Sequence, residues 1–315
     1  MFDVSIIIVN WNVRELLANC LRSLFRYNKS LLKHEVIIID NHSSDNSVQF
    51  LRENFPLVKI IENKENHGFA RANNQGIIEA FGRYILLINP DTFWIDNSLE
   101  KIVEFMDKNL DVGALGPKLL NIDKETIQYW GARRLPLPLD TFFEYSKISS
   151  LFSRNRLLNR QLIGNWDHKD SREVQCLSGA CLFIRRETIQ EVGLLDEQYP
   201  LYSEDTDWCH RVHLTKWKMY YLAEAQLVHI GSQSSLQNRG PATIKGIQGT
   251  YRYYCKFYGL GTILSIWFLI WITSIYKIFA WVFVLIINPY SREIALKQVG
   301  VYWDICFLLP PIEKK

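Results

Sequence analysis

The sequence predicts an α/β protein built on a doubly wound, mostly parallel sheet. Along residues 1–120, short runs rich in Val and Ile alternate with stretches of helical character, as in successive strand–helix–strand units. These runs are nearly continuous in apolar residues, which is typical of strands buried on both faces. The 315 residues, 48% hydrophobic and 22% charged, suit a globular protein with one large core and room for an extension.

The expected elements follow one another along the chain. Strands are predicted at Val4 to Val9, Val36 to Ile39, Val58 to Ile61, Tyr84 to Ile88, Val174 to Ile184 and Met219 to Leu222. Helices are predicted near Val13 to Arg26, Ser47 to Asn54, Arg71 to Ala80 and Glu204 to Leu214. A main domain is therefore expected over residues 1–240, with halves at 1–120 and 170–240. Residues 120–169, which contain Pro136 and Pro138, are interpreted as a mobile connection.

Residues 241–315 differ in kind from the main domain. Leu260 to Ile287 is almost wholly apolar and is interrupted by Lys277. The piece before Lys277 has about 17 residues, the lower limit for spanning a bilayer. A charge inside a span is costly, whereas an interfacial helix lets the lysine reach water. A helix or helical hairpin lying in the membrane surface is favoured, while a true span and a helix buried on the domain or a partner remain alternatives.

Charge and cysteine usage indicate the compartment. The net charge of +3, with acids and bases mixed along the chain, does not predict a nucleic-acid partner. Six cysteines without a C-x-x-C pair fit a reduced, cytosolic setting. The N-terminus reads directly as a strand without the features of an export signal. The expected location is the cytoplasmic face of the inner (plasma) membrane, peripheral or monotopic.

Polar residues at strand ends are the first candidates for ligand binding. Asp40 ends a buried strand, where ligands of open α/β sheets bind, so it can accept hydrogen bonds from a nucleobase or ribose. Alternatively, it only ends the strand while Ser44 or Asp45 caps the next helix. In N-K-E-N-H-G-F-A-R-A-N-N, residues 63–74, a turn at Gly68 leads into a helix whose free N–H groups, with Arg71, suit an anion. An ordinary junction is the alternative. The segment is neither a Walker loop nor a G-x-G-x-x-G motif, which argues against a nucleoside triphosphatase and a dehydrogenase.

A metal site is suggested by two further positions. Asp91 follows an apolar strand in Asn89-Pro90-Asp91, where a carboxylate can hold Mg²⁺ or Mn²⁺ against a diphosphate. A simple turn after the strand is the alternative. His229, after a later strand, can complete the coordination of the ion, although a lone histidine is more often structural.

Three acids begin a predicted helix and suggest a catalytic base. Glu204, Asp205 and Asp207 lie within one helical turn. Because each residue turns a helix by about 100°, Asp205 and Asp207 point about 200° apart, so one of them is structural. A carboxylate here can act as the general base of an inverting transfer. Alternatively, Ser203 caps the helix, and the helix dipole stabilises the three acidic side chains in its first turn.

Seven motifs in order carry a family resemblance. They are V-S-I-I-I-V-N-W-N, I-I-D-N-H-S-S-D-N-S, N-H-G-F-A-R-A-N-N-Q-G, I-N-P-D-T, L-S-G-A-C-L-F-I-R-R, G-L-L-D-E-Q-Y-P-L-Y-S-E-D-T-D-W-C-H-R and H-I-G-S. Over residues 3–232 they resemble glycosyltransferase family 2, especially the rhamnosyltransferase branch that builds O-antigen, lipopolysaccharide and other cell-surface polysaccharides. The resemblance implies a GT-A fold and an inverting transfer dependent on Mg²⁺ or Mn²⁺. The implied donor is a nucleotide diphosphate sugar and the implied acceptor a glycolipid or polyprenyl-linked saccharide.

The resemblance also implies residue roles. Asp205 matches the catalytic base, Asp91 matches the second acid of the D-x-D metal motif, and His229 matches a histidine that joins the ion. Residues 1–120 would be the nucleotide-binding half, in which the donor contacts Asn10, Asp40, Asn66, Phe69, Arg71, Asn74 and Asn89. Residues 170–240 would be the acceptor and catalytic half, with Gly179, Glu204, Asp207 and Trp208 on the acceptor side.

One position departs from the family pattern. Asn89 replaces the first D-x-D acid, so it offers a carbonyl oxygen without charge and is a weaker or outer ligand. The implied mechanism is a single displacement. Asp205 takes the proton of the acceptor hydroxyl while the ion stabilises the leaving diphosphate. A dTDP-rhamnose donor is expected on resemblance, and a UDP-sugar is the alternative.

Two other functions are alternatives to this one. A nucleotidyltransferase ordinarily has a Gly-rich basic loop near its N-terminus, and Val4 to Arg14 contains none. A non-catalytic scaffold that binds a nucleotide sugar for an assembly complex is the other alternative. Asp91 and the Glu204-Asp205 pair favour the enzyme.

Overall fold

The structure is a computed structural model that describes residues 2–28, 32–152, 155–231, 239–288 and 292–310. It forms two compact units. The N-terminal unit consists of Met1–Leu135, Trp166–Glu197 and Glu204–Ser234, and the C-terminal unit of Pro136–Asn165, Gln198–Ser203 and Ser235–Lys315. Instead of one boundary near residue 240, the chain crosses between the units several times, because residues 136–165 and 198–203 pack with the C-terminal helices.

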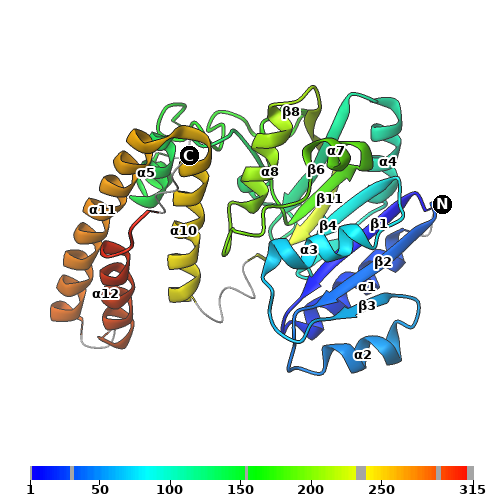
Figure 1. Cartoon of the computed structure of the whole chain (residues 1–315), viewed down its shortest axis with the longest axis horizontal. Helices are drawn as coiled ribbons and strands as arrows, with labels where there is room; N and C mark the ends of the chain where they lie inside the picture. Colours follow the sequence, from blue (N-terminus) through cyan, green and yellow to red (C-terminus); the bar gives the residue numbers. More distant parts are fainter. Residues whose placement is uncertain (1, 29–31, 153–154, 232–238, 289–291, 311–315) are drawn as a thin grey trace. The chain divides into compact units, whose positions relative to one another are not determined.

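The N-terminal unit is built on one sheet, which has nine strands within the described residues. The strand order is β3-β2-β1-β4-β10-β6-β11-β5, and β8 pairs with β11 outside this path (Figure 1). A separate pair is formed by β7 and β9. The strands are β1 Val4–Asn10, β2 His34–Asp40, β3 Lys59–Glu62, β4 Tyr84–Ile88, β5 Thr92–Trp94, β6 Val112–Leu120, β7 Ala132–Arg133, β8 Arg172–Val174, β9 Cys176–Leu177, β10 Cys181–Arg185 and β11 Lys218–His229.

The expected mostly parallel sheet is confirmed. Strands β1 to β4, β6 and β11 run in one direction, while β5, β8 and β10 run in the other. The run expected as one strand at 174–184 is divided into three, because its parts pair with β11, β7 and β4 respectively. The turn at Ser178 and Gly179 separates β9 from β10 and places Gly179 at the carboxyl end of β4.

The four helices predicted from the sequence near residues 13–26, 47–54, 71–80 and 204–214 are present, and helices at 98–108 and 186–192 were not predicted. Leu17, Leu21 and Leu24 repeat on one face of α1 and pack into the same core as Ile6 and Ile8 of β1. Full burial of each leucine contributes roughly 1.5–3 kcal/mol. The helices of this unit are α1 Arg14–Tyr27, α2 Ser47–Asn54, α3 Phe69–Ile78, α4 Ser98–Lys108, α7 Arg186–Val192 and α8 Glu204–His213, with a 3₁₀ turn, η1, at Tyr129–Gly131.

The cysteines are structural in this fold. All six thiols are free, and Cys20, Cys176, Cys181 and Cys209 are buried in the N-terminal unit. A buried free thiol packs as a small hydrophobe, and the reduced state of these cysteines stays a prediction.

The C-terminal unit is helical. Its described helices are α5 Pro138–Tyr145, α6 Ile148–Leu151, α10 Arg239–Tyr258, α11 Leu260–Ile287 and α12 Arg292–Cys306. Tyr251 and Tyr254 of α10 pack with Ile263, Ile266 and Ile270 of α11 in its core. The segment expected to be a mobile connection thus contributes α5, whose Thr141 hydroxyl lies 2.7 Å from the Tyr254 hydroxyl.

Helix α11 is one unbroken helix over the predicted apolar run. Its 28 residues have a mean hydropathy of 2.1 in the most apolar window, and at 1.5 Å per residue it is about 42 Å long. By length and composition it is the described helix that can cross a membrane, and only 17% of that window is buried. The Lys277 ammonium lies 3.8 Å from the Tyr145 ring centroid and 4.9 Å from that of Tyr302. The positive charge of Lys277 therefore lies over two aromatic rings of the C-terminal unit.

Candidate active site

The carboxyl ends of β1 and β2 form the first part of the site. Asn10 and Asp40 are partners in register, and both are buried. Asn10 Nδ2 donates to Asp40 Oδ1 at 2.9 Å and to Ser43 Oγ at 3.0 Å, while Asp40 Oδ2 accepts the Ser43 N–H at 2.9 Å. Asp40 thus shapes the turn after its strand, and its carboxylate keeps further lone pairs for a ligand.

The turn before α3 lies beside this first part. Asn41 Nδ2 donates to the Gly68 carbonyl at 3.1 Å, and Asn66 Oδ1 accepts the Gly68 N–H at 2.9 Å. Gly68 has φ +79°, in the left-handed region that glycine adopts without strain, and α3 begins at the next residue, Phe69. The helix therefore starts at the predicted place, with Arg71 exposed in its first turn.

Asn74 is separated from this group by its contacts. It is buried, its Nδ2 donates to the Leu195 carbonyl and to Glu197 Oε1, both at 2.9 Å, and its Oδ1 accepts the Leu195 N–H at 3.0 Å. Both amide hydrogens are therefore used within the protein. Asn74 therefore links α3 to the 195–197 segment, and its nucleotide contact stays a prediction.

Asp91 and His229 lie together because of strand pairing. Thr92 of β5 is the partner of His229 of β11, and Asp91 directly precedes Thr92. His229 Nε2 is 3.3 Å from Asp91 Oδ1, and Asp91 Oδ2 accepts the Gly231 N–H at 3.1 Å. Asn89 joins them, with its Nδ2 at 3.5 Å from His229 Nε2. Ser232, the last residue of the H-I-G-S motif, lies outside the described residues.

This donor set suits a divalent cation. Asp91 offers a carboxylate oxygen and His229 a ring nitrogen at a spacing typical of neighbouring ligands of one ion. The described residues contain no group of three His, Cys, Asp or Glu side chains arranged for a metal. A site with two protein ligands leaves positions for diphosphate oxygens and water, as Mg²⁺ sites at phosphates usually do.

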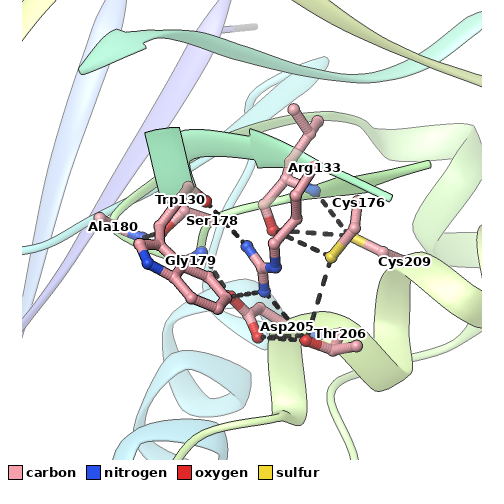
Figure 2. Close-up of polar contacts among 10 residues, drawn as sticks. Trp130, Arg133, Cys176, Ser178, Gly179, Ala180, Asp205, Thr206 and Cys209 are labelled. Carbon is pink, nitrogen blue, oxygen red and sulfur yellow. Dashed lines mark hydrogen bonds and ion pairs between the residues drawn. The ribbon is translucent and has the colours of Figure 1, made fainter. Parts of the chain in front are cut away.

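Asp205 lies at the start of α8 and receives four hydrogen-bond donors (Figure 2). Its Oδ1 accepts the Thr206 N–H at 2.6 Å and the Thr206 hydroxyl at 3.2 Å. Its Oδ2 accepts the Gly179 N–H at 3.1 Å and is 3.4 Å from Arg133 Nη2. The long contact to Arg133 leaves Oδ2 available for a further proton donor, and 19% of the side chain is exposed.

Gly179 connects the two chemical centres. A Cβ built on Gly179 meets Asp205 Cβ and Phe69 Cε1, each at 3.5 Å, so Phe69, Gly179 and Asp205 are in mutual proximity. The next residue, Ala180, accepts the Asn89 N–H at 3.0 Å. The segment 178–180 therefore touches the candidate base on one side and the Asn89-Pro90-Asp91 turn on the other.

Glu204 is held in its neutral form. The side chain is buried, and Oε2 has no hydrogen-bond partner among the described residues. Burial, together with the nearby charge of Asp205, raises the pKa of Glu204 to about 8. At neutral pH the Asp205 carboxylate thus has an uncharged neighbour.

Asp207 and Trp208 make their polar contacts with residues other than Asp205. Asp207 is fully buried and its Oδ2 accepts from Arg211 Nε at 2.8 Å, while the Trp208 indole N–H donates to the Gly193 carbonyl at 3.0 Å. The helical geometry predicted that one of the two aspartates is structural, and these contacts give that role to Asp207. The place of Asp207 and Trp208 on the acceptor side stays a prediction.

Two residues of this region had no assigned role in the sequence. Arg133 is buried beside Asp205, where Nη1 donates to the Trp130 carbonyl at 2.9 Å and Nη2 to the Thr206 hydroxyl at 3.0 Å (Figure 2). Gln128 Oε1 lies 2.8 Å from His229 Nδ1. Both belong to residues 120–169, whose irregular composition gave no periodic pattern by which to find them.

Comparisons with known proteins identify the family. Residues 5–193 match the family model described as glycosyl transferase family 2. An N-acetylglucosaminyl-diphospho-decaprenol L-rhamnosyltransferase of Mycobacterium tuberculosis is 26% identical over 227 residues, which cover 66% of this chain and 69% of that protein. A UDP-Glc:alpha-D-GlcNAc-diphosphoundecaprenol beta-1,3-glucosyltransferase of Escherichia coli is 30% identical over 107 residues, covering 34% and 42%.

A solved structure supports the fold. The mannosyltransferase PcManGT from Pyrobaculum calidifontis, in complex with GDP-Man and Mn²⁺, has a TM-score of 0.53 at 14% identity and covers 97% of this chain and 87% of its own. The expected GT-A-like architecture is thereby confirmed. Because the family model spans more than half of the 315 residues, this chain belongs to glycosyl transferase family 2 and is a nucleotide-sugar-dependent glycosyltransferase.

Proposed function

We propose that this protein transfers L-rhamnose from dTDP-rhamnose to a saccharide on a polyprenyl diphosphate, with inversion of the anomeric carbon. The observation that carries the proposal is the segment 178–180, which touches both Asp205 and the turn that bears Asp91. The proposed base and the proposed site for the leaving diphosphate are therefore joined through one short segment. The name of the Mycobacterium tuberculosis relative supports the choice of sugar and of a lipid-linked acceptor.

Asp91 and His229 are proposed to hold Mg²⁺ or Mn²⁺. A bound ion of this kind supplies positive charge that stabilises the leaving diphosphate. Asn89, at the same turn, contributes a neutral amide beside the two ligands. The presence of Mn²⁺ in the PcManGT complex supports this assignment for a protein of the same fold.

Asp205 is proposed as the general base. Inverting transfer requires a general base, here a carboxylate, on the face of the donor sugar opposite the diphosphate. There it takes the proton of the attacking acceptor hydroxyl. Asp205 is partly exposed, whereas its neighbours Glu204 and Asp207 are buried. The four donors around its carboxylate fix the side chain in one orientation. The hydroxyl of the saccharide acceptor therefore meets a base that is already positioned to take its proton.

The nucleotide is proposed to bind at the ends of β1 and β2. Asn10 and Asp40 lie there, and the turn from Asn66 to Phe69 continues the same surface. The free N–H groups at the start of α3, together with Arg71, suit the negative charge of the diphosphate. Gly179 and Glu204 remain the residues proposed to shape the acceptor side.

The acceptor is proposed to be reached at the cytoplasmic membrane surface. Apolar side chains of α11 are exposed along the helix, among them Phe268, Ile272, Phe279, Phe283 and Ile286. Such a surface suits the hydrocarbon boundary of a bilayer, where a polyprenyl chain resides. The relatives named for decaprenol- and undecaprenol-linked substrates support this kind of acceptor.

A transfer assay tests the proposal. The full chain in detergent micelles receives dTDP-rhamnose, a prenyl-diphosphate-linked N-acetylglucosamine and Mn²⁺, and the product is examined by mass spectrometry and NMR. We expect a rhamnosylated lipid with the anomeric configuration opposite to that of the donor. Asp205→Asn should lose transfer, while Asp167→Asn, which changes an exposed carboxylate of the same unit, should retain it. A product with retained configuration would contradict the mechanism.

A UDP-sugar donor is the second candidate. It is favoured by the Escherichia coli relative, whose name specifies UDP-glucose. The same assay with UDP-glucose in place of dTDP-rhamnose separates the two. Transfer from UDP-glucose alone would keep the site assignments and change the sugar.

A further inference from the structure

We propose that Gln128 is a positioning residue that holds His229 in one tautomer, with the proton on Nδ1 and the free lone pair of Nε2 directed at Asp91. The inference rests on the proposed function, because the free lone pair is what a divalent ion requires. It assigns a role to a residue that the family resemblance did not include.

Gln128 contacts His229 at two points. Its Nε2 lies 2.6 Å from the His229 backbone carbonyl, and its Oε1 lies 2.8 Å from His229 Nδ1. A backbone carbonyl can only accept, so the Gln128 NH₂ group must face it. The amide oxygen then faces the ring, and because this oxygen can only accept, Nδ1 must carry the hydrogen.

A chain of hydrogen bonds behind Gln128 has the same direction. Gln128 Nε2 also donates to Asn121 Oδ1 at 2.9 Å, and Asn121 Nδ2 donates to the Thr126 hydroxyl at 2.8 Å. The Thr126 hydroxyl in turn donates to Asp123 Oδ2 at 2.6 Å. Gln128 and Asn121 each donate one hydrogen bond toward Asp123, and Gln128 also donates to the His229 carbonyl. Rotating either amide alone by 180° would therefore bring two acceptors, or two donors, face to face.

The far end of the chain is fixed by a charge. The hydrogen bond from Thr126, with the backbone N–H groups of Glu125 and Thr126, lowers the pKa of Asp123. This carboxylate is therefore ionised at neutral pH and acts only as an acceptor. Its state determines that the Thr126 hydroxyl accepts from Asn121 instead of donating to it.

The backbone places Gln128 beside His229. Strand β6 ends at Leu120, the chain turns, and Ile127 returns to bridge Leu120, while the Gln128 N–H donates to the Leu119 carbonyl at 2.8 Å. Leu120 is the register partner of Val228 in β11. A glutamine at this position thus lies next to the end of β11, where His229 is.

The consequence appears at Asp91. In the proposed tautomer, Nε2 of His229, which lies 3.3 Å from Asp91 Oδ1, presents its lone pair beside the Asp91 carboxylate. The opposite tautomer of the neutral ring would set the Nδ1 lone pair against Gln128 Oε1 and remove the free lone pair from Nε2. Loss of such an orienting partner typically weakens metal binding about 10–100-fold.

The tautomer is tested directly by NMR of the full chain labelled with ¹⁵N-histidine, in detergent and without metal, at a pH where the ring is neutral. The His229 signals are identified by their loss in His229→Asn. We expect Nδ1 protonated and Nε2 unprotonated in the wild type. A neutral ring protonated at Nε2 would overturn the proposal, whatever the activity of the enzyme.

Binding of Mn²⁺ in the presence of dTDP, followed by electron paramagnetic resonance of the free ion, is the second test. We expect Gln128→Met to lower the affinity for Mn²⁺ about 10–100-fold. Gln175→Met is the matched control, since Gln175 Oε1 also accepts one N–H, that of Leu135 at 3.3 Å, but has no contact with His229. It should bind Mn²⁺ as the wild type does.

The outcomes separate the two proposals. Equal Mn²⁺ affinity in Gln128→Met and the wild type would overturn the role of Gln128. Failure of the wild type to bind Mn²⁺ would count against the ion in the proposed function, and the NMR spectrum would still decide the tautomer.

Discussion

Glu204→Gln should make the protein more stable as the pH rises, relative to the wild type. Burial and the charge of Asp205 raise the pKa of Glu204 to about 8 in the folded state, against about 4.3 in an unfolded chain. Between these values the folded state keeps a proton that the unfolded state has released. Stability of the wild type therefore falls with rising pH over this interval. Glutamine has nearly the same shape and no proton to lose, so the variant lacks this slope.

The magnitude follows from the interval. One pH unit corresponds to about 1.4 kcal/mol for a single proton, so pH 5 to pH 8 sets an upper limit of about 4 kcal/mol. Relaxation around the ionised carboxylate reduces such a penalty, because buried sites respond with an effective dielectric constant of about 20. We expect about 2 kcal/mol, a melting-temperature difference between variant and wild type that grows by about 4–8 °C over this range.

The assay is thermal unfolding of both proteins at pH 5, 6, 7 and 8. Glu187→Gln is the matched control, because Glu187 also lies in the first turn of a helix but is exposed. Its difference from the wild type should not change with pH. A Glu204→Gln difference that stays constant or shrinks as the pH rises would refute the reasoning from burial.

Three further predictions concern catalysis, the ion and the C-terminal unit. Asp205→Asn should lower turnover by about 10²–10⁴-fold while dTDP still binds, measured by product formation and calorimetry; turnover near the wild-type rate would exclude Asp205 as the base. Asn89→Asp adds a second carboxylate beside the ion and should tighten Mn²⁺ binding by roughly tenfold in titrations without nucleotide; weaker binding would place residue 89 away from the ion. Gly249→Ala should destabilise the C-terminal unit by about 1–3 kcal/mol, because the new Cβ meets the Tyr202 carbonyl at 2.7 Å, whereas Gly261→Ala, with nothing within 4 Å, should not. Equal unfolding midpoints for the two alanine variants would contradict this packing.

Local patterns predicted the elements whose neighbours in sequence decide their structure. The apolar runs of β1, β2 and β4 and the unbroken run of α11 lie within a few residues of their predicted bounds. The opposition of Asp205 and Asp207 also followed from helical geometry alone. In each case the information is contained in one short segment.

The features that the sequence did not predict depend on contacts between residues far apart in the chain. Gln128 meets His229 across 101 residues of chain, and Arg133 reaches Thr206 across 73. Asn74 matched a family motif, yet its amide is used by Leu195 and Glu197, which lie far along the chain. The 201–203 segment belongs to the C-terminal unit, where its backbone packs closely against Gly249 of α10, which has no side chain in the way. No periodic pattern marks any of these contacts.

Donor hydrolysis across a panel of nucleotide sugars tests the central claim most directly. The wild type and Asp91→Ala are each assayed with and without Mn²⁺ or Mg²⁺. We expect turnover of one donor, dTDP-rhamnose, that requires the ion and is lost in Asp91→Ala. Turnover of that donor at the same rate without a divalent ion, or an Asp91→Ala variant as active as the wild type, would contradict it.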